Sequence, residues 1–195
     1  PRRSANNYTG TWDLGTTLSE TAWTCRFKLN ITSVDNSGDT CRVFYGLSSH
    51  PATTGASSNS LSFVGFATYT NSSQSQYYRL STRGNNLDVG EAQQKSLSAE
   101  TVYVEIIRKS GTKYSVRWTT NSDYTGGTLV DDQDIGGNGG SGSQSSMALR
   151  YFWVGNINVS GNSDCHIQGT IEDIKIDDGA TSFSSADYQF NASDV

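Results

Sequence analysis

The sequence has little proline, methionine or cysteine, and it contains no long hydrophobic run. Of its 195 residues, two are Pro, one is Met and three are Cys. No apolar stretch approaches the roughly 20 residues that a membrane-spanning helix needs, so we expect no membrane insertion. Long windows with helical periodicity are also missing, which disfavours a helical fold.

Basic residues are scattered along the chain and do not form clusters. The sequence has 14 Lys and Arg against 19 Asp and Glu, which gives a formal net charge of −5. A nucleic-acid-binding surface needs clustered Lys and Arg to contact phosphates. The charge pattern therefore disfavours nucleic acid and anionic membranes as partners.

The composition favours short strands joined by polar turns. Hydrophobic residues make up 34% of the chain and charged residues 17%, while Gly, Ser, Thr and Asn are abundant. All-β sandwiches often reach this length as one unit, so we predict a single domain over residues 1–195. Residues 136–146 are rich in Gly and Ser, and we predict a flexible loop there.

Residues 22–32 show the clearest alternation in the sequence. Trp23, Cys25, Phe27, Leu29 and Ile31 fall on one side of an extended strand, with mainly polar residues on the other. One face of this strand is therefore predicted to be core. The stretch 34–39 contains turn-forming residues, so 41–47 is predicted to return as the partner strand of a hairpin.

A second hairpin is predicted from 101–108 and 113–120, and a surface crossover at 91–100. Residues 149–154 carry bulky groups on both faces, which is typical of a strand inside a sheet. The spacing of isoleucines over 167–176 breaks at Glu172-Asp173, where we predict a bulge. Further strands are expected at 8–14, 61–70, 77–81, 86–89, 128–130 and 186–191, the last beside the first. Together these strands predict an all-β, two-sheet antiparallel β-sandwich.

Several motifs fall in an order that resembles a known superfamily. Residues 149–156 read L-R-Y-F-W-V-G-N and residues 169–179 read G-T-I-E-D-I-K-I-D-D-G, preceded by T-A-W-T-C-R-F-K-L at 21–29, V-F-Y-G-L-S-S at 43–49 and V-Y-V-E-I-I-R at 102–108. This order resembles the concanavalin A-like lectin/glucanase superfamily in its laminin-G-like variants. The resemblance implies a jelly-roll sandwich, often one that binds glycans.

Glycan binding needs aromatic rings for the C–H faces of sugars and polar groups for their hydroxyls. We expect at least half of the rings of this chain to fill the core. The candidate ligand-binding residues are Tyr77, Tyr78, Arg79, Arg117, Trp118, Tyr151, Trp153 and His50.

Catalysis is less well supported by the sequence. Glucanases of this superfamily carry their acids on one strand as E-x-D-x-x-E, whereas the nearest stretch here is Glu172-Asp173-Ile-Lys-Ile-Asp177. Glu105 has no acidic residue two positions away on its strand. The sequence therefore favours a non-catalytic module over an enzyme and offers no catalytic residues.

Three further chemistries are open. Asp131, Asp132 and Asp134, or alternatively Asp177 and Asp178, offer hard oxygen ligands for calcium, although acidic turns usually only solvate a surface. Cys25, Cys41 and Cys165 allow one disulfide in any of three pairings, or Cys25 is a small buried hydrophobe. Five Asn-x-Ser/Thr sequons are candidate glycosylation sites: Asn7, Asn30, Asn71, Asn158 and Asn191.

The sequence predicts a carbohydrate-binding or adhesion module that is extracellular, at a cell surface or on a virion, with glycans or glycoproteins as partners. The first alternative is a structural subunit of an extracellular assembly, which would contact copies of itself or other subunits through edge strands. The second is a glycan-cleaving enzyme of the same fold.

Overall fold

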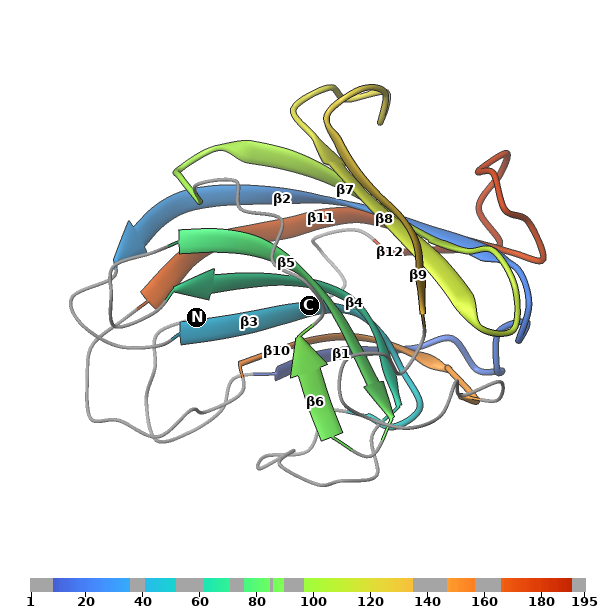
Figure 1. Ribbon diagram of the computed structural model, residues 1–195. Helices are drawn as coiled ribbons and strands as arrows, with labels where there is room; N and C mark the ends of the chain where they lie inside the picture. The colour runs from blue at the N-terminus through green and yellow to red at the C-terminus, as the bar shows by residue number, and fades with distance from the viewer. Residues whose placement is uncertain are drawn as a thin grey trace.

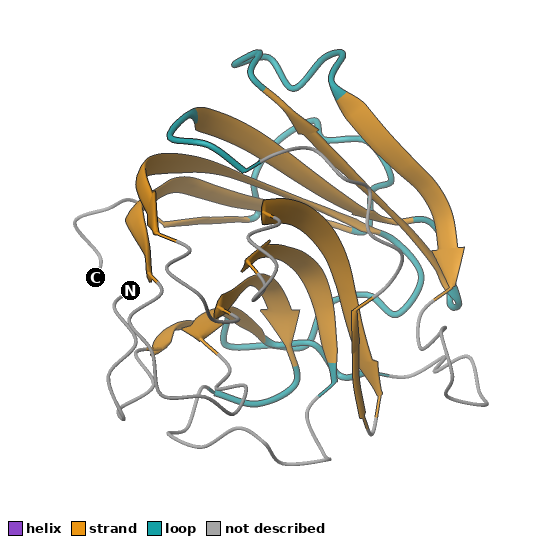
Figure 2. Ribbon diagram, turned by 60° about the vertical axis from the view of Figure 1, so that its left-hand side comes forward, coloured by secondary structure: helices purple, strands orange, loops and turns teal. Residues whose placement is uncertain are grey.

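The structure is a computed structural model that describes residues 9–35, 41–51, 62–70, 76–84, 86–89, 97–134, 147–156 and 166–190. Within these ranges all regular structure is β (Figure 2). The strands are β1 (Thr9–Asp13), β2 (Trp23–Asp35), β3 (Cys41–Ser48), β4 (Phe63–Thr70), β5 (Gln76–Gly84), β6 (Asn86–Val89), β7 (Thr101–Arg108), β8 (Lys113–Thr119), β9 (Thr128–Asp134), β10 (Tyr151–Asn156), β11 (His166–Asp178) and β12 (Tyr188–Phe190). No helix in the described ranges is long and apolar enough to cross a membrane.

The strands form two stacked sheets of six strands each (Figure 1). The first sheet has the order β1-β10-β3-β4-β5-β6, and the second has the order β12-β11-β2-β7-β8-β9. Neighbouring strands are antiparallel throughout both sheets, from β1 with β10 to β8 with β9. The predicted two-sheet antiparallel β-sandwich is confirmed.

The core lies between the two sheets and follows the alternation seen in the sequence. Phe27 and its alternate neighbours on β2 are buried, as are Tyr45 and its alternate neighbours on β3. The rings of Phe27 and Tyr45 meet across the two layers with centroids 6.3 Å apart. The prediction that one face of residues 22–32 is core is confirmed.

The predicted hairpin of 22–32 with 41–47 is wrong. β2 pairs with β11 and β7 in the second sheet, whereas β3 pairs with β10 and β4 in the first sheet. The two consecutive strands thus face each other across the core and share no ladder. The second predicted hairpin is confirmed, because β7 pairs directly with β8.

β10 and β11 behave as their sequences predict. β10 lies inside its sheet between β1 and β3. The ladder between β11 and β2 shifts register between Glu172 and Lys175, and Asp173 in between has a positive φ of 52°. The predicted bulge is therefore present. A second register shift lies between Gln168 and Gly169.

The last strand does not pair with the first. β12 adds to β11 in the second sheet, while β1 adds to β10 in the first. The two strands meet only across the layers, where the rings of Trp12 and Phe190 lie 6.4 Å apart.

β9 runs to Asp134 and is longer than the predicted 128–130. The predicted loop at 136–146 lies outside the described residues, as does most of the predicted crossover at 91–100.

Candidate functional site

The outer face of the first sheet carries a second hydrophobic cluster, distinct from the core. It consists of Phe44 on β3, Phe63 and Ala67 on β4, and Trp153 on β10, all of them buried. The Trp153 ring lies 6.2 Å from that of Phe44 and 5.4 Å from that of Phe63. Trp153 alternates with Phe152, which belongs to the core, so the cluster lies on the opposite side of the sheet from the core.

A glycine allows this packing. A Cβ atom built on Gly155 would lie 2.1 Å from the indole ring of Trp153, which therefore rests against the backbone of its own strand. The Nε1 atom of Trp153 is buried and has no hydrogen-bond partner in the described part of the protein. The indole of Trp153 is thus a buried, apolar part of the outer cluster.

Next to this cluster, at the start of β10, one aromatic side chain and two charged side chains lie close together. We call Asp13, Arg150 and Tyr151 the Tyr151 corner. Asp13 and Tyr151 are paired across the β1–β10 ladder. Arg150 donates from Nε and Nη2 to the two carboxylate oxygens of Asp13, at 2.7 and 2.9 Å. The guanidinium carbon of Arg150 lies 5.5 Å from the centre of the Tyr151 ring.

The charges of the Tyr151 corner are fixed and reachable. The hydrogen bond from Arg150, helped by the backbone N–H of Gly15, lowers the pKa of Asp13, and Asp13 in turn raises the pKa of Arg150. Both groups are therefore ionised at neutral pH. The side chains of Arg150 and Asp13 are 40% and 47% exposed, so a ligand can contact them.

His50 lies at the same end of the first sheet. Ser48 is the ladder partner of Tyr151, and its hydroxyl donates to the carbonyl of His50 at 2.7 Å. His50 itself is exposed, and its Nδ1 is 2.8 Å from the hydroxyl of Ser49. The structure thus brings two of the candidate ligand-binding residues, His50 and Tyr151, to the same end of the first sheet.

Other predicted rings are in the interior, which corrects the expectation that they face a ligand. Tyr78 and Trp118 are buried in the core and pack against Phe66, with ring centroids 5.3 and 5.6 Å from it. Trp153 is buried in the outer cluster. A buried ring offers no face on which a sugar can stack. Tyr77 and Arg79 lie on β5, but their side chains are outside the described part of the structure.

Arg117 belongs to a different surface, the outer face of the second sheet. There Arg26 binds Glu105 at 2.6 Å, and Arg117 lies 3.9 Å from the same carboxylate. The guanidinium carbon of Arg26 also lies between two rings, 4.6 Å from the centre of Tyr124 and 4.7 Å from that of Phe183. Arg117 is thus part of an internally paired network and does not meet Tyr151.

Two carboxylates of that face, Glu172 and Glu105, are paired with cations. Glu172 binds Lys28 at 2.8 Å, and this contact lowers the pKa of the carboxyl group. Glu105 is almost buried between Arg26 and Arg117. A glycosidase needs one carboxylic acid with a raised pKa to protonate the leaving group, whereas the pKa of Glu172 is lowered.

The aspartates predicted as calcium ligands lie on β9, an edge strand. Asp131 accepts hydrogen bonds from Lys109 and from the hydroxyl of Ser115, and Lys109 also reaches Asp132 at 3.3 Å. The contact with Lys109 is the main cause of the lowered pKa of Asp131. The side chain of Asp134 is outside the described part. Within that part, no three His, Cys, Asp or Glu residues are grouped as a metal site.

Cys25 is a free, buried thiol whose pKa is raised by burial. This agrees with the small-hydrophobe alternative and corrects the two disulfide pairings that include Cys25. The side chain of Cys41 and the whole of Cys165 lie outside the described part.

Among the sequons, Asn30 is described: its Oδ1 accepts a hydrogen bond from Thr101 at 3.3 Å. Asn7, Asn71, Asn158 and Asn191 fall outside the described residues.

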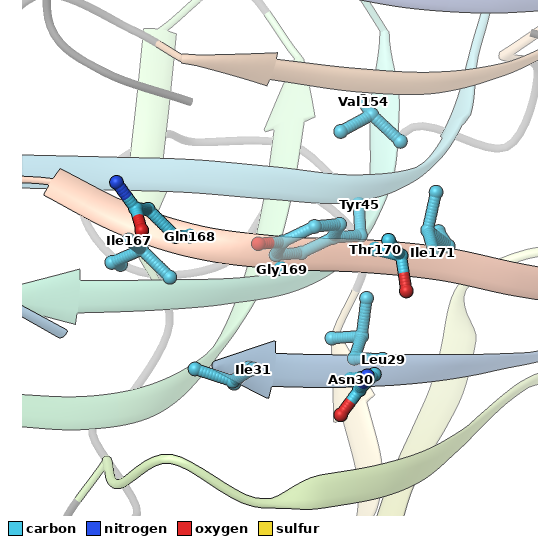
Figure 3. A pocket seen from close by; sticks show the side chains of 10 residues that line it. All are labelled: Leu29, Asn30, Ile31, Tyr45, Val154, Ile167, Gln168, Gly169, Thr170 and Ile171. Carbon is cyan, nitrogen blue, oxygen red and sulfur yellow. The ribbon is translucent and has the colours of Figure 1, made fainter. Parts of the chain in front are cut away.

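A pocket of about 170 Å³ opens at the edge of the sandwich, between β10 and β3 of the first sheet and β11 and β2 of the second (Figure 3). Its walls are mainly apolar, and the ring of Tyr45 lies near the centre of the lining residues. Sequence reasoning missed this pocket, because its walls come from four strands that are far apart in the chain.

No protein-family model and no characterised protein sequence matches this chain. Solved structures do share its fold. The CBM2 module of an evolved Dit protein from Lactobacillus casei BL23 phage J-1 matches with a TM-score of 0.51 and 13% identity, over 87% of this chain and 67% of that one. Tailspike protein 2 from an Escherichia coli O157:H7 bacteriophage matches with a TM-score of 0.51 and 15% identity, over 89% of this chain and 22% of the tailspike.

A variant of alginate lyase Aly36B in complex with alginate tetrasaccharide matches with a TM-score of 0.52 and 14% identity, over 87% of this chain and 71% of the lyase. At these identities the likeness establishes the architecture alone. The described part of the chain is therefore a two-sheet β-sandwich, an architecture that it shares with a phage carbohydrate-binding module, a tailspike and an alginate lyase.

Proposed function

We propose that this chain is a non-catalytic carbohydrate-binding module whose ligand contacts the Tyr151 corner on the outer face of the first sheet. The observation that carries the proposal is the contact of a half-buried tyrosine ring with an exposed, bidentate Arg150–Asp13 pair. The ring face of Tyr151 suits the C–H groups of a sugar. The guanidinium donates and the carboxylate accepts, so together they suit neighbouring hydroxyls.

The geometry of the corner also suits binding without chemistry. Asp13 and Arg150 are held in place by each other and by the β1–β10 ladder, so little side-chain entropy is lost when a ligand binds. Asp13 is ionised, with its pKa lowered by Arg150, and an ionised carboxylate accepts hydrogen bonds but cannot protonate a glycosidic oxygen.

The likeness to the phage Dit module and the tailspike supports a place on a virion or in the extracellular space. We propose that the chain presents the Tyr151 corner outward from such a particle or surface and attaches it to glycans or glycoproteins of a host.

A glycan array probed with the 195-residue chain tests this proposal, with Tyr151→Ala as the site variant. The matched control is Tyr103→Ala, because Tyr103 is also half-buried but lies on the outer face of the second sheet. We expect the wild type and Tyr103→Ala to retain the same glycans and Tyr151→Ala to lose them. Parallel arrays with calcium and with a chelator test whether calcium, for which Asp131, Asp132 and Asp134 are candidate ligands, contributes to binding. Equal binding by all three proteins would overturn the location of the site.

The assembly alternative has one observation in its favour. Among the described residues, β12 pairs with β11 only over Ile174–Ile176, so the remainder of that edge of β11 has no described partner strand. An open edge can add a strand from another chain. If the array shows no retained glycan and the chain elutes as a large oligomer, the structural role replaces glycan binding.

A further inference from the structure

The edge pocket is separate from the Tyr151 corner. Val154 lines the pocket from the inner face of β10, whereas Tyr151 stands on the outer face of the same strand. The pocket reaches into the space between the two sheets, where Leu29 and Ile31 come from β2 and Tyr45 comes from β3. A ligand in this pocket would therefore contact side chains of both sheets.

Side chains cover the edge of the sandwich next to the pocket, whereas the pocket itself opens to solvent. Trp12 and Phe190 contact each other across the two layers at the level where β12 covers Ile174 and Ile176. Ile171 lies beyond the described pairing with β12. It is only half-buried, as is Val154, and these two side chains mark the mouth of the pocket.

The depth of the pocket is apolar and its rim is polar. Leu29, Ile31 and Ile167 are buried within it, with 2–4% of their surface exposed. The exposed Gln168 and Thr170 stand on β11 at the second bulge, where the register with β2 shifts. Bulges re-aim side chains and are common beside binding sites. The hydroxyl of Thr170 already donates to Glu172 at 2.8 Å, which leaves the amides of Gln168 and Asn30 as the polar groups of the lining.

The size and lining of the pocket define what fits it. Its volume is about 170 Å³, and a cavity of about 150 Å³ with aliphatic and aromatic walls stays dry and binds benzene or xenon. We propose that the edge pocket binds a compact apolar group, either a single aromatic ring or a short branched alkyl chain, on a ligand whose polar part lies beside Gln168. The hydroxyl of Tyr45 is 3.4 Å from that of Thr68, so the pocket floor offers mainly ring carbon to the ligand.

Methyl NMR of the 195-residue chain tests the proposal directly, with benzene and xenon as separate probes and 13C-labelled isoleucine methyl groups as reporters. Ile31, Ile167 and Ile171 line the pocket, whereas Ile106 and Ile176 are fully buried in the core away from it. We expect saturable shifts at the three lining isoleucines with both probes and no change at the two controls. The absence of saturable shifts in the wild type would overturn the proposal, as would equal shifts at Ile106 and Ile176.

A filled pocket provides the matched variant. Val154→Phe places a ring at the mouth and is expected to abolish the benzene shifts. Ile107→Phe, at a half-buried position on the outer face of the second sheet, is expected to keep them. Ile171→Phe serves as the second filling variant if Val154→Phe does not fold. Retention of the shifts in a folded filling variant contradicts the proposal. Glycan binding at the Tyr151 corner should survive these substitutions, so the two sites can fail independently.

Discussion

Trp12 and Phe190 lie 6.4 Å apart, centroid to centroid, although their strands belong to different sheets and exchange no ladder hydrogen bonds. Trp12 also packs edge-on against Phe152 at 5.7 Å, so the contact continues into the core. The pair closes the edge of the sandwich between β1 and β12.

Replacement of Phe190 by Ala tests this closure. Phe190 is half-buried, so we expect a loss of about 1–2 kcal/mol in the free energy of unfolding, less than for a fully buried ring. Urea unfolding followed by tryptophan fluorescence measures it. The exposed neighbour Gln189 supplies the control, and Gln189→Ala should change stability by less than about 0.5 kcal/mol. Equal stability of Phe190→Ala and the wild type would show that the edge contact is dispensable.

Gly169 is expected to tolerate no side chain. A Cβ atom at this position would lie 2.2 Å from the carbonyl oxygen of Asn30. The backbone of both residues is held in place by the β2–β11 ladder, so neither can easily move away. Gly169→Ala should therefore destabilise the protein by about 1–3 kcal/mol. Gly111→Ala is the control, because nothing lies within 4 Å of its added Cβ. Thermal unfolding of both variants decides the matter, and similar melting temperatures would contradict the expected clash.

Arg26 and Glu105 should be strongly coupled. Glu105 is 5% exposed, and the two groups are 2.6 Å apart on paired positions of β2 and β7. A double-mutant cycle with Arg26→Met and Glu105→Gln should give a coupling energy of about 1–2 kcal/mol. The more exposed pair of Arg150 and Asp13 should give a smaller value, because solvent screens it. A larger coupling for the exposed pair would contradict this ranking.

Asp177 should contribute to stability in a pH-dependent manner. The backbone N–H of Ser184, together with that of Ser185 and the Ser184 hydroxyl, lowers the pKa of this carboxyl group below its ordinary 3.8. Because the folded-state pKa is lower than the unfolded one, the stabilisation is fully present above about pH 5 and is lost as pH falls through the folded-state value.

Urea unfolding of the wild type and Asp177→Asn across the range from pH 7 to pH 2 checks this. The wild type should be the more stable protein at pH 7, and the difference should shrink towards pH 2. A difference that stays constant over the whole range would rule out the carboxylate as its source.

The sequence predicted the faces of the strands better than their partners. Alternation places Phe27 towards a core, which is correct, but it does not say which strand lies opposite, and the structure places Tyr45 there. A turn-forming connection suits a hairpin and also suits a chain that passes from one layer to the other. The predicted hairpin of 22–32 with 41–47 failed for this reason, whereas 101–108 and 113–120 do share a ladder.

The candidate site shows the same limit. Tyr151 and His50 were found as residue types that suit sugars, but Asp13 has no signal in the sequence because it lies 137 residues from Arg150. Tyr78 and Trp118 were included because one sequence does not say which ring is exposed. Trp118 alternates in phase with Val116 on β8, and the structure places both in the core.

The central claim is that glycans bind at the Tyr151 corner, and chemical-shift mapping of the 195-residue chain with an array-selected oligosaccharide tests it most directly. Our account predicts backbone amide shifts that concentrate at Asp13 and Tyr151 and spread to Ser48, with none along β7. A set of shifts centred on β7 and β8, around Glu105, would contradict it.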